Sequence, residues 1–219
     1  MWIVLLAIGL AGVAADDGAT RLFDGATLDG WVAEGASETV IDGVNAPVWV
    51  VEDGQIVCRG KGFGFLRYKE REFDDFTFHV EFRMLAPKCN SGIGFRTTAF
   101  DPADSRGTRP SFYSYEIQLI DDAGQPPNPH SSGSLYRYMA PRENAMKPVG
   151  EWNTIEVTCQ GSRVRVVLNG KTLHDIDQVQ VDALKTKPLR GYVCLQNHGG
   201  QIAFRSVEIR EPDRETATK

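Results

Sequence analysis

Hydrophobic and polar residues alternate along several segments of the chain, most clearly between residues 76 and 84. In the run from Phe76 to Met84 every even position is apolar and every odd position is polar. Successive side chains of a β-strand point to opposite faces, so this pattern predicts a strand with one buried face. Residues 154–159 and 164–168 alternate in the same way.

Turn signals separate these segments. Asp53-Gly54 and Asn169-Gly170 each stand between two alternating runs and predict β-hairpins, of type I′ for the Asn-Gly pair. The parity of the apolar positions changes after Phe204, which predicts a β-bulge near Arg205. No segment keeps a helical period over three turns.

Short strands with turn residues between them indicate an all-β fold, a β-sandwich or jelly roll of two antiparallel sheets. The pattern shows no repeat and no linker, so we expect one domain over residues 16–211 and a frayed tail over 212–219. Residues 100–110 and 122–134 are rich in Asp, Pro, Gly and Ser and are expected to be loops. Long ordered loops on a rigid sandwich commonly shape a binding site.

The first fifteen residues carry no Asp, Glu, Lys or Arg and end in Val-Ala-Ala. A short apolar run before small residues is typical of a secretory signal peptide, so we expect cleavage near Ala15 and an exported protein, periplasmic or extracellular. The alternative is an uncleaved membrane anchor. That would need about twenty apolar residues, so the mature protein is expected to be free of the membrane.

Composition limits the partners. The formal net charge of the 219 residues is −5, which argues against a nucleic-acid binder and leaves neutral ligands such as sugars open. Export would permit two disulfides among Cys58, Cys89, Cys159 and Cys194 in three pairings. Four buried thiols are the alternative, and the pairing stays open.

Some strands carry polar groups on the face where a plain sandwich would be apolar. Between residues 90 and 96, Ile93 and Phe95 point one way, while Asn90, two glycines and Arg96 point the other. Glycine inside a strand often marks the close approach of a ligand. Glu116 and Gln118 share a face in the next predicted strand. A cross-strand ion pair between Arg96 and Glu116 is the structural alternative.

A third polar strip contains Gln196 and His198. Histidine titrates near neutrality and is the commonest general acid or base, although a lone histidine is more often structural. His79 and His174 are expected to be solvated surface residues. Tyr136 adds an aromatic face that can stack on a sugar and hydrogen-bond through its hydroxyl group.

In chain order, seven stretches resemble the 3-keto-disaccharide hydrolase family, which has a concanavalin A-like sandwich. They are LFDGATLDGW (22–31), NSGIGFR (90–96), YEIQLID (115–121), GSLY (133–136), KPVGEWN (147–153), LNG (168–170) and LQNHG (195–199). The resemblance covers about residues 20 to 210. The segment 100–110 stands as an insertion that is expected to reshape the mouth of the site.

The resemblance implies cleavage of glycosides whose sugar is oxidised to a ketone at carbon 3. That ketone acidifies the proton on carbon 2, so a base can remove it, the group on carbon 1 leaves by elimination, and water adds later. We assign Glu116 as the base, Arg96 and Gln118 as donors to carbonyl and hydroxyl oxygens, and His198 as the acid or its partner. The further candidates for substrate binding are Asn90, Asp121, Tyr136, Lys147 and Gln196.

Three alternatives remain open at this stage. Glu116 and Asp121 could act as a carboxylate pair in direct hydrolysis, but five residues separate them, so a regular strand would put them on opposite faces. A divalent metal such as calcium could be held by Glu116, Asp121 or His198, although no spacing demands it. The domain could also be a non-catalytic, lectin-like module, because fold does not fix activity.

Overall fold

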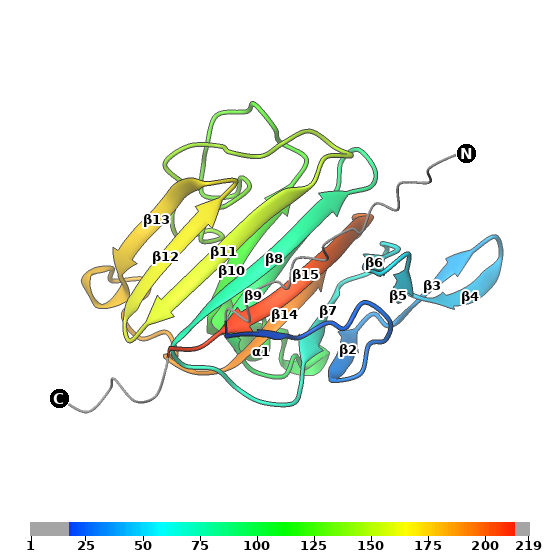
Figure 1. Ribbon diagram of the computed structural model, residues 1–219, viewed down its shortest axis with the longest axis horizontal. Coiled ribbons are helices and arrows are strands. Elements are labelled where there is room, and N and C mark those ends of the chain that lie inside the picture. Colours follow the sequence, from blue (N-terminus) through cyan, green and yellow to red (C-terminus); the bar gives the residue numbers. More distant parts are fainter. Residues whose placement is uncertain (1–17, 213–219) are drawn as a thin grey trace, which may run out of the picture.

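Two antiparallel sheets lie face to face in the computed structural model, which describes residues 18–212 (Figure 1). This confirms the predicted all-β sandwich. The predicted signal peptide and residues 213–219 of the predicted tail lie outside the described residues. Within residues 18–212 no helix is long and apolar enough to cross a membrane.

The larger sheet has eight strands and forms the front layer of Figure 1. Its strands in spatial order are β13 (Lys171–Asp177), β12 (Arg163–Leu168), β11 (Asn153–Gln160), β8 (Phe76–Met84), β15 (Ile202–Arg210), β6 (Gln55–Cys58) and β5 (Trp49–Glu52). The short strand β1 (Ala19–Arg21) also pairs with β15.

The smaller sheet has five strands and carries most of the candidate site. Its strands in spatial order are β10 (Tyr115–Ile120), β9 (Asn90–Thr97), β14 (Tyr192–Asn197), β7 (Gly64–Tyr68) and β2 (Trp31–Gly35). A separate hairpin of β3 (Glu38–Ile41) and β4 (Val44–Pro47) projects from the edge of the sandwich. It is seen at the right of Figure 1.

The core fills the space between the two sheets. The even positions of β8, from Phe76 to Met84, are at most 2% exposed, as their alternation predicts. Ile93 and Phe95 of β9 and Ile117 of β10 meet them from the smaller sheet and are 0% exposed. Because these odd positions face the core, the even positions of β9 as far as Gly94 and those of β10 point away from it.

The predicted turns are confirmed. Asp53 and Gly54 join β5 to β6, both with positive φ, and Asn169 and Gly170 (φ 50° and 79°) join β12 to β13. Asn-Gly suits such a turn because asparagine tolerates a positive φ and glycine adopts it freely. The register of β15 shifts between Arg205 and Glu208, which confirms the bulge.

Two expectations need correction. The segment 100–110 is not plain loop, because it holds η1 (Pro102–Asp104) and α1 (Ser105–Thr108), and α2 (Pro110–Tyr113) follows. A further 3-10 turn, η2 (Gln178–Gln180), follows β13. His174 is not solvated: it is 2% exposed, and its Nε2 lies 2.9 Å from the carbonyl oxygen of Gly133.

All four cysteines, Cys58, Cys89, Cys159 and Cys194, are buried as free thiols. Of the two arrangements that the sequence left open, disulfides and buried thiols, the structure therefore has buried thiols.

Candidate functional site

The smaller sheet gathers three of the predicted site residues on its face away from the core. Glu116 is paired with Gly94 and Gln118 with Gly92, while Gln196 is paired with Gly92 from the other side. Glu116, Gln118 and Gln196 are 4%, 4% and 1% exposed. Adjacent strands thus bring a carboxyl and two carboxamides together in a dry environment, as the strand parity predicted.

Gly92 allows this contact. A Cβ at this position would lie 3.3 Å from Oε1 of Gln196 and 3.5 Å from Cγ of Glu116. At Gly94 a Cβ would lie 2.6 Å from Sγ of Cys194 and 3.2 Å from Cγ of Pro110. The missing side chains therefore let Glu116 approach Gln196 across β9, and they let α2 lie directly on the sheet.

Several buried polar atoms at this face have no hydrogen-bond partner within the described protein. They are Oδ1 of Asn90, Oε1 of Gln118, Oε1 of Gln196, the hydroxyl oxygen of Ser134 and Nε of Arg109. Buried polar groups are usually hydrogen-bonded, so such a group requires an explanation. A cluster of them around one carboxyl is the arrangement expected of a site that binds a hydroxyl-rich ligand.

Tyr136 reaches the same face from a segment that lies along the edge of β10. The amide of Tyr136 donates to the carbonyl of Glu116 at 2.8 Å, and Leu135 forms an isolated bridge with Ile117. This antiparallel pairing puts Leu135 in the core and Tyr136 on the side of Glu116. The ring of Tyr136 lies 5.3 Å from that of His130.

Burial raises the pKa of Glu116 above its usual range, because a carboxylate without water is poorly stabilised. The side chains of Gln196 and Ser111 and the charges of Arg109 and Arg137 act in the opposite direction. Burial is the largest of these effects. A carboxyl whose pKa is raised by burial is a stronger base than an exposed one, as proton abstraction requires.

Arg109 is the cation at this site, and the sequence did not single it out. Its guanidinium carbon lies 3.9 Å from the ring centroid of Phe63, and its charge lowers the pKa values of both Glu116 and His198. The only signal in the sequence was its position in the segment 100–110, which was expected to shape the mouth of the site.

Aromatic rings hold this part of the site in place. Phe63, Phe65 and Phe100 pack edge to face with ring centroids 5.0 to 5.6 Å apart. The ring of His198 joins them, 5.0 Å from that of Phe63. His198 is exposed, and partial burial together with Arg109 lowers the pKa of its imidazole. The lowered pKa favours the uncharged imidazole.

Lys187 and Tyr138 fix the segment that carries Arg109. The ammonium of Lys187 donates to the carbonyl of Phe112 in α2 and lies 3.1 Å from the hydroxyl of Tyr138. That hydroxyl in turn donates to the carbonyl of Ser111 at 2.9 Å. These bonds from a buried lysine and a tyrosine keep α2 against β9 and β10, so Arg109 has a defined position.

Arg96 does not belong to this face, which corrects the expected alignment. It is 0% exposed, and its Nη2 donates to the carbonyls of Asp74 and Gly161, each at 2.8 Å. The alternation fails because the register between β14 and β9 shifts after Tyr192, and Arg96 adopts φ 53°. The alternative, an ion pair between Arg96 and Glu116, is also absent from the described residues: the carboxylate near Arg96 is that of Asp75, at 3.8 Å.

Asp121 and Lys147 also lie apart from the site. Asp121 follows the end of β10, is exposed, and accepts the amide of Lys88 at 3.0 Å. β10 pairs with β9 without a bulge, so nothing brings Asp121 to the side of Glu116. Lys147 donates to the carbonyl of Trp152 at 2.9 Å, in the loop that leads into β11 of the other sheet.

The described part of the chain contains no set of ligands for the divalent metal that the sequence left possible. Among residues 18–212 no group of three or more His, Cys, Asp or Glu side chains is placed to hold a metal ion. Glu116, Asp121 and His198 in particular are not brought together.

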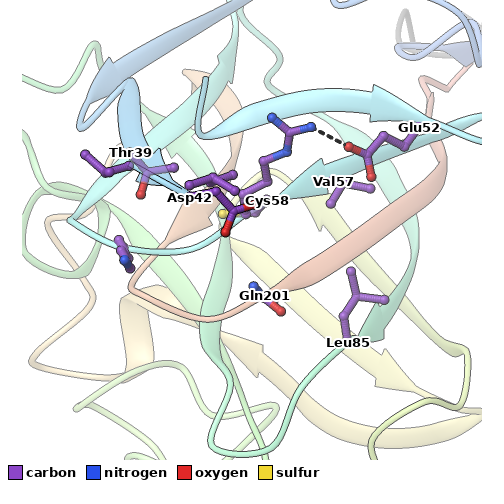
Figure 2. A pocket seen from close by; sticks show the side chains of 11 residues that line it. Thr39, Asp42, Glu52, Val57, Cys58, Leu85 and Gln201 are labelled. Atoms are coloured by element: carbon purple, nitrogen blue, oxygen red, sulfur yellow. Dashed lines mark hydrogen bonds and ion pairs between the residues drawn. The ribbon is translucent and has the colours of Figure 1, made fainter. Parts of the chain in front are cut away.

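A separate hollow of about 510 Å³ lies between the β3–β4 hairpin and the ends of β6 and β8 (Figure 2). Val57 and Leu85 provide apolar lining, and an ion pair between Arg59 and Glu52 at 2.6 Å crosses one side. None of the site residues predicted from the sequence lines it. No buried side-chain nitrogen or oxygen of its lining residues lacks a partner. Of these two places, the Glu116 face is the one with unpartnered buried polar atoms.

Two solved structures of carbohydrate-binding proteins share this fold. The lumenal domain of VIP36 in a Ca²⁺/Man3GlcNAc-bound form matches with a TM-score of 0.58, covering 92% of this chain and 91% of that one at 13% identity. The carbohydrate-binding module CBM66 of Bacillus subtilis matches with a TM-score of 0.53, covering 83% and 96% at 13% identity. At these identities the likeness shows the fold alone. It defines the class as a galectin- and concanavalin A-like sandwich.

The family follows from the sequence match. The model of the 3-keto-alpha-glucoside-1,2-lyase-like domain matches residues 18–210, and the chain therefore belongs to that family. This confirms the resemblance found in the sequence. The chain is similar to a 3-keto-disaccharide hydrolase of Bacteroides thetaiotaomicron, with 24% identity over 237 residues, 90% of this chain and 79% of that protein. It is also similar to a candidate glycosyl hydrolase of Parabacteroides distasonis, with a TM-score of 0.71 and 25% identity, covering 90% and 94%.

Proposed function

We propose that this protein is an exported enzyme that cleaves 3-keto-glycosides, including 3-keto-disaccharides. Membership of a family of 3-keto-glycoside hydrolases and lyases supports the substrate class. The observation that carries the proposal is the buried carboxyl of Glu116, with its raised pKa, among unpartnered polar atoms. The apolar run ending at Ala15 supports export.

Glu116 acts as the base. It takes the proton from carbon 2 of the 3-keto sugar, and the electrons of the broken C–H bond form an enolate with its negative charge on the oxygen at carbon 3. Arg109 takes the role first assigned to Arg96. Of the two arginines whose charges act on Glu116 it is the half-buried one, whereas Arg137 is exposed, and its guanidinium can stabilise the enolate oxygen. Gln118, Gln196 and Asn90 bind the sugar hydroxyls through their unpartnered carboxamide oxygens.

The enolate then re-forms the ketone as the bond between carbon 1 and the leaving oxygen breaks. The proton held by Glu116 passes to that oxygen, which restores the carboxylate and releases the leaving group as an alcohol. Water adds across the carbon 1–carbon 2 double bond, so the net reaction is hydrolysis. The lowered pKa of His198 suits an uncharged hydrogen-bonding partner better than an acid.

The experiment offers the purified protein a 3-keto-glucoside and its unoxidised parent, each with and without a chelator, and follows release of the leaving group. We expect cleavage of the 3-keto-glucoside alone. In D₂O the released 3-keto-glucose should carry deuterium at carbon 2, beyond the exchange measured without enzyme. Cleavage without deuterium would indicate direct hydrolysis instead.

Glu116→Gln should abolish this turnover while keeping sugar affinity. Glu156→Gln is the matched control, since Glu156 lies on β11 of the other sheet beside His79. Release from neither substrate, with binding of sugar retained, would favour a lectin-like module and contradict the proposal. Full turnover by Glu116→Gln would show that another group is the base.

A further inference from the structure

Three arginines contact two aromatic rings, and the charges of two of them, Arg109 and Arg137, act on Glu116. Arg106 and Arg137 both contact the ring of Phe112, with guanidinium carbons 5.6 and 4.2 Å from its centroid. Arg109 lies over the ring of Phe63 at 3.9 Å. Arg106 and Arg109 come from the segment 100–110, and Arg137 comes from the segment along the edge of β10.

These arginines differ from most others in how their charges are compensated. Arg67, Arg163 and Arg205 form ion pairs with carboxylates on the same sheet. Within residues 18–212, the guanidinium groups near Phe112 and Phe63 make no ion pair. The nearby carboxylates of Asp101 and Asp104 instead accept the amides of Ala103 and Gly107.

The chain as a whole has a formal charge of −5, and the segment 100–110 carries Asp101 and Asp104 beside Arg106 and Arg109. The three guanidinium groups are therefore not part of a generally basic surface. A neutral 3-keto sugar has use for one cation, at the enolate oxygen, and Arg109 supplies it. Arg106 and Arg137 are exposed, and a neutral substrate gives their charges no role.

We propose that the leaving group of the natural substrate carries an oxyanion, a carboxylate or a phosphate, which Arg106 and Arg137 bind. The inference rests on the function proposed above. Guanidinium groups present paired N–H donors that match both a carboxylate and a phosphate. Because the two arginines already lie against Phe112, their side chains lose less conformational freedom when they bind an oxyanion. Because Arg137 also acts on Glu116, the bound oxyanion would sit at the edge of the reaction site.

The test compares three 3-keto-glucosides that differ only in the leaving sugar: glucose, glucuronic acid and glucose 6-phosphate. The measured quantity is the ratio of kcat/KM for each anionic substrate to kcat/KM for the neutral one. We expect a ratio of about ten or more for at least one anion, as for one charge-assisted hydrogen bond. It should fall with added salt. The anion with the larger ratio identifies the oxyanion.

Arg106→Gln and Arg137→Gln should each lower this ratio, and the double variant should bring it to about one. Arg165→Gln is the matched control, since Arg165 is exposed on β12 and its guanidinium donates to Thr172. A wild-type ratio near one for both anions, or a ratio that survives the double variant, would overturn the inference and leave the proposed function intact.

A separate measurement distinguishes this failure from failure of the proposed function. If no 3-keto-glucoside is cleaved, the function is wrong, and calorimetric binding then decides the inference. Free glucuronate or glucose 6-phosphate should bind more tightly than glucose to the wild-type protein but not to the double variant. Equal binding of all three to the wild-type protein would overturn the inference.

Discussion

Replacing Arg96 tests whether this residue supports the fold or the reaction. Its Nη2 is the donor to two carbonyls, those of Asp74 and Gly161, at 2.8 Å each, and the side chain is 0% exposed. Arg96→Met removes the donor and leaves these carbonyls without it. Hydrogen bonds to a charged group contribute about 1.5–3 kcal/mol each, so the two together contribute about 3–6 kcal/mol. The substitution also removes the buried Nε and Nη1 of Arg96, which have no hydrogen-bond partner, and this offsets part of the loss.

We therefore expect Arg96→Met to lose about 3–5 kcal/mol of unfolding free energy. For a chain of this size that corresponds to a fall in Tm of roughly 6–20 °C. Arg96→Lys keeps the charge but not the planar donor geometry, so its free energy of unfolding should lie between those of the wild type and Arg96→Met. The matched surface change Arg165→Met should alter stability by less than about 0.5 kcal/mol.

Urea unfolding followed by tryptophan fluorescence measures the stability, and kcat/KM for a 3-keto-glucoside is measured well below the unfolding transition. The folded Arg96→Met protein should keep its kcat within a few-fold of the wild type. An unchanged urea midpoint together with a loss of kcat by orders of magnitude would refute the structural role. It would restore Arg96 to the site that the sequence suggested.

Three further outcomes are expected. Because the folded-state pKa of Glu116 is raised, its contribution to stability is present at low pH and is lost as pH rises through that pKa. Glu116→Gln should therefore be more stable than the wild type at pH 8 and about equal to it at pH 4. Equal urea midpoints of the two proteins at both pH values would contradict this. Gly92→Ala would place a Cβ 2.9 Å from the carbonyl oxygen of Ile117. The substitution should therefore lower the free energy of unfolding in urea by about 1–3 kcal/mol and also lower kcat/KM. Wild-type values of the unfolding free energy and of kcat/KM would refute the close approach. Burial raises the pKa of the Cys58, Cys89 and Cys159 thiols to about 12. An aromatic disulfide reagent at pH 8 should therefore react with no thiol of the native protein and with four thiols after unfolding. Fewer than four reactive thiols in the unfolded protein would reveal a disulfide.

Strand parity predicted much of the site because it depends only on local geometry. Glu116 and Gln118 differ by two residues in a strand without a bulge, so they had to share a face. Gln196 joined them because its strand pairs with β9 at Gly92. The sequence could not reveal that pairing. The family resemblance named the right strips but not their order in the sheet.

Parity failed where the strand was irregular. Arg96 follows Gly94 by two residues, yet a register shift and a positive φ turn it to the other side. Nothing in the local sequence marks this shift. Arg109 was missed for the complementary reason. Its position depends on long-range contacts of α2 with Lys187 and Tyr138, residues distant in the sequence.

Sandwiches of this class in lectins and carbohydrate-binding modules need donors, acceptors and aromatic rings for sugar binding, but not a carboxyl held away from water. Burying Glu116 opposes its ionisation and therefore works against stability at neutral pH. A binding module could obtain the same hydrogen bonds from an exposed carboxylate or a carboxamide without that penalty. The burial is useful where a proton has to be taken from carbon, because a carboxylate of raised pKa is the stronger base. The segment 100–113 packs on β9 and β10 through α2 and places both Ser111 and Arg109 near Glu116. This one part of the chain would therefore distinguish the proposed reaction site from a sugar-binding face.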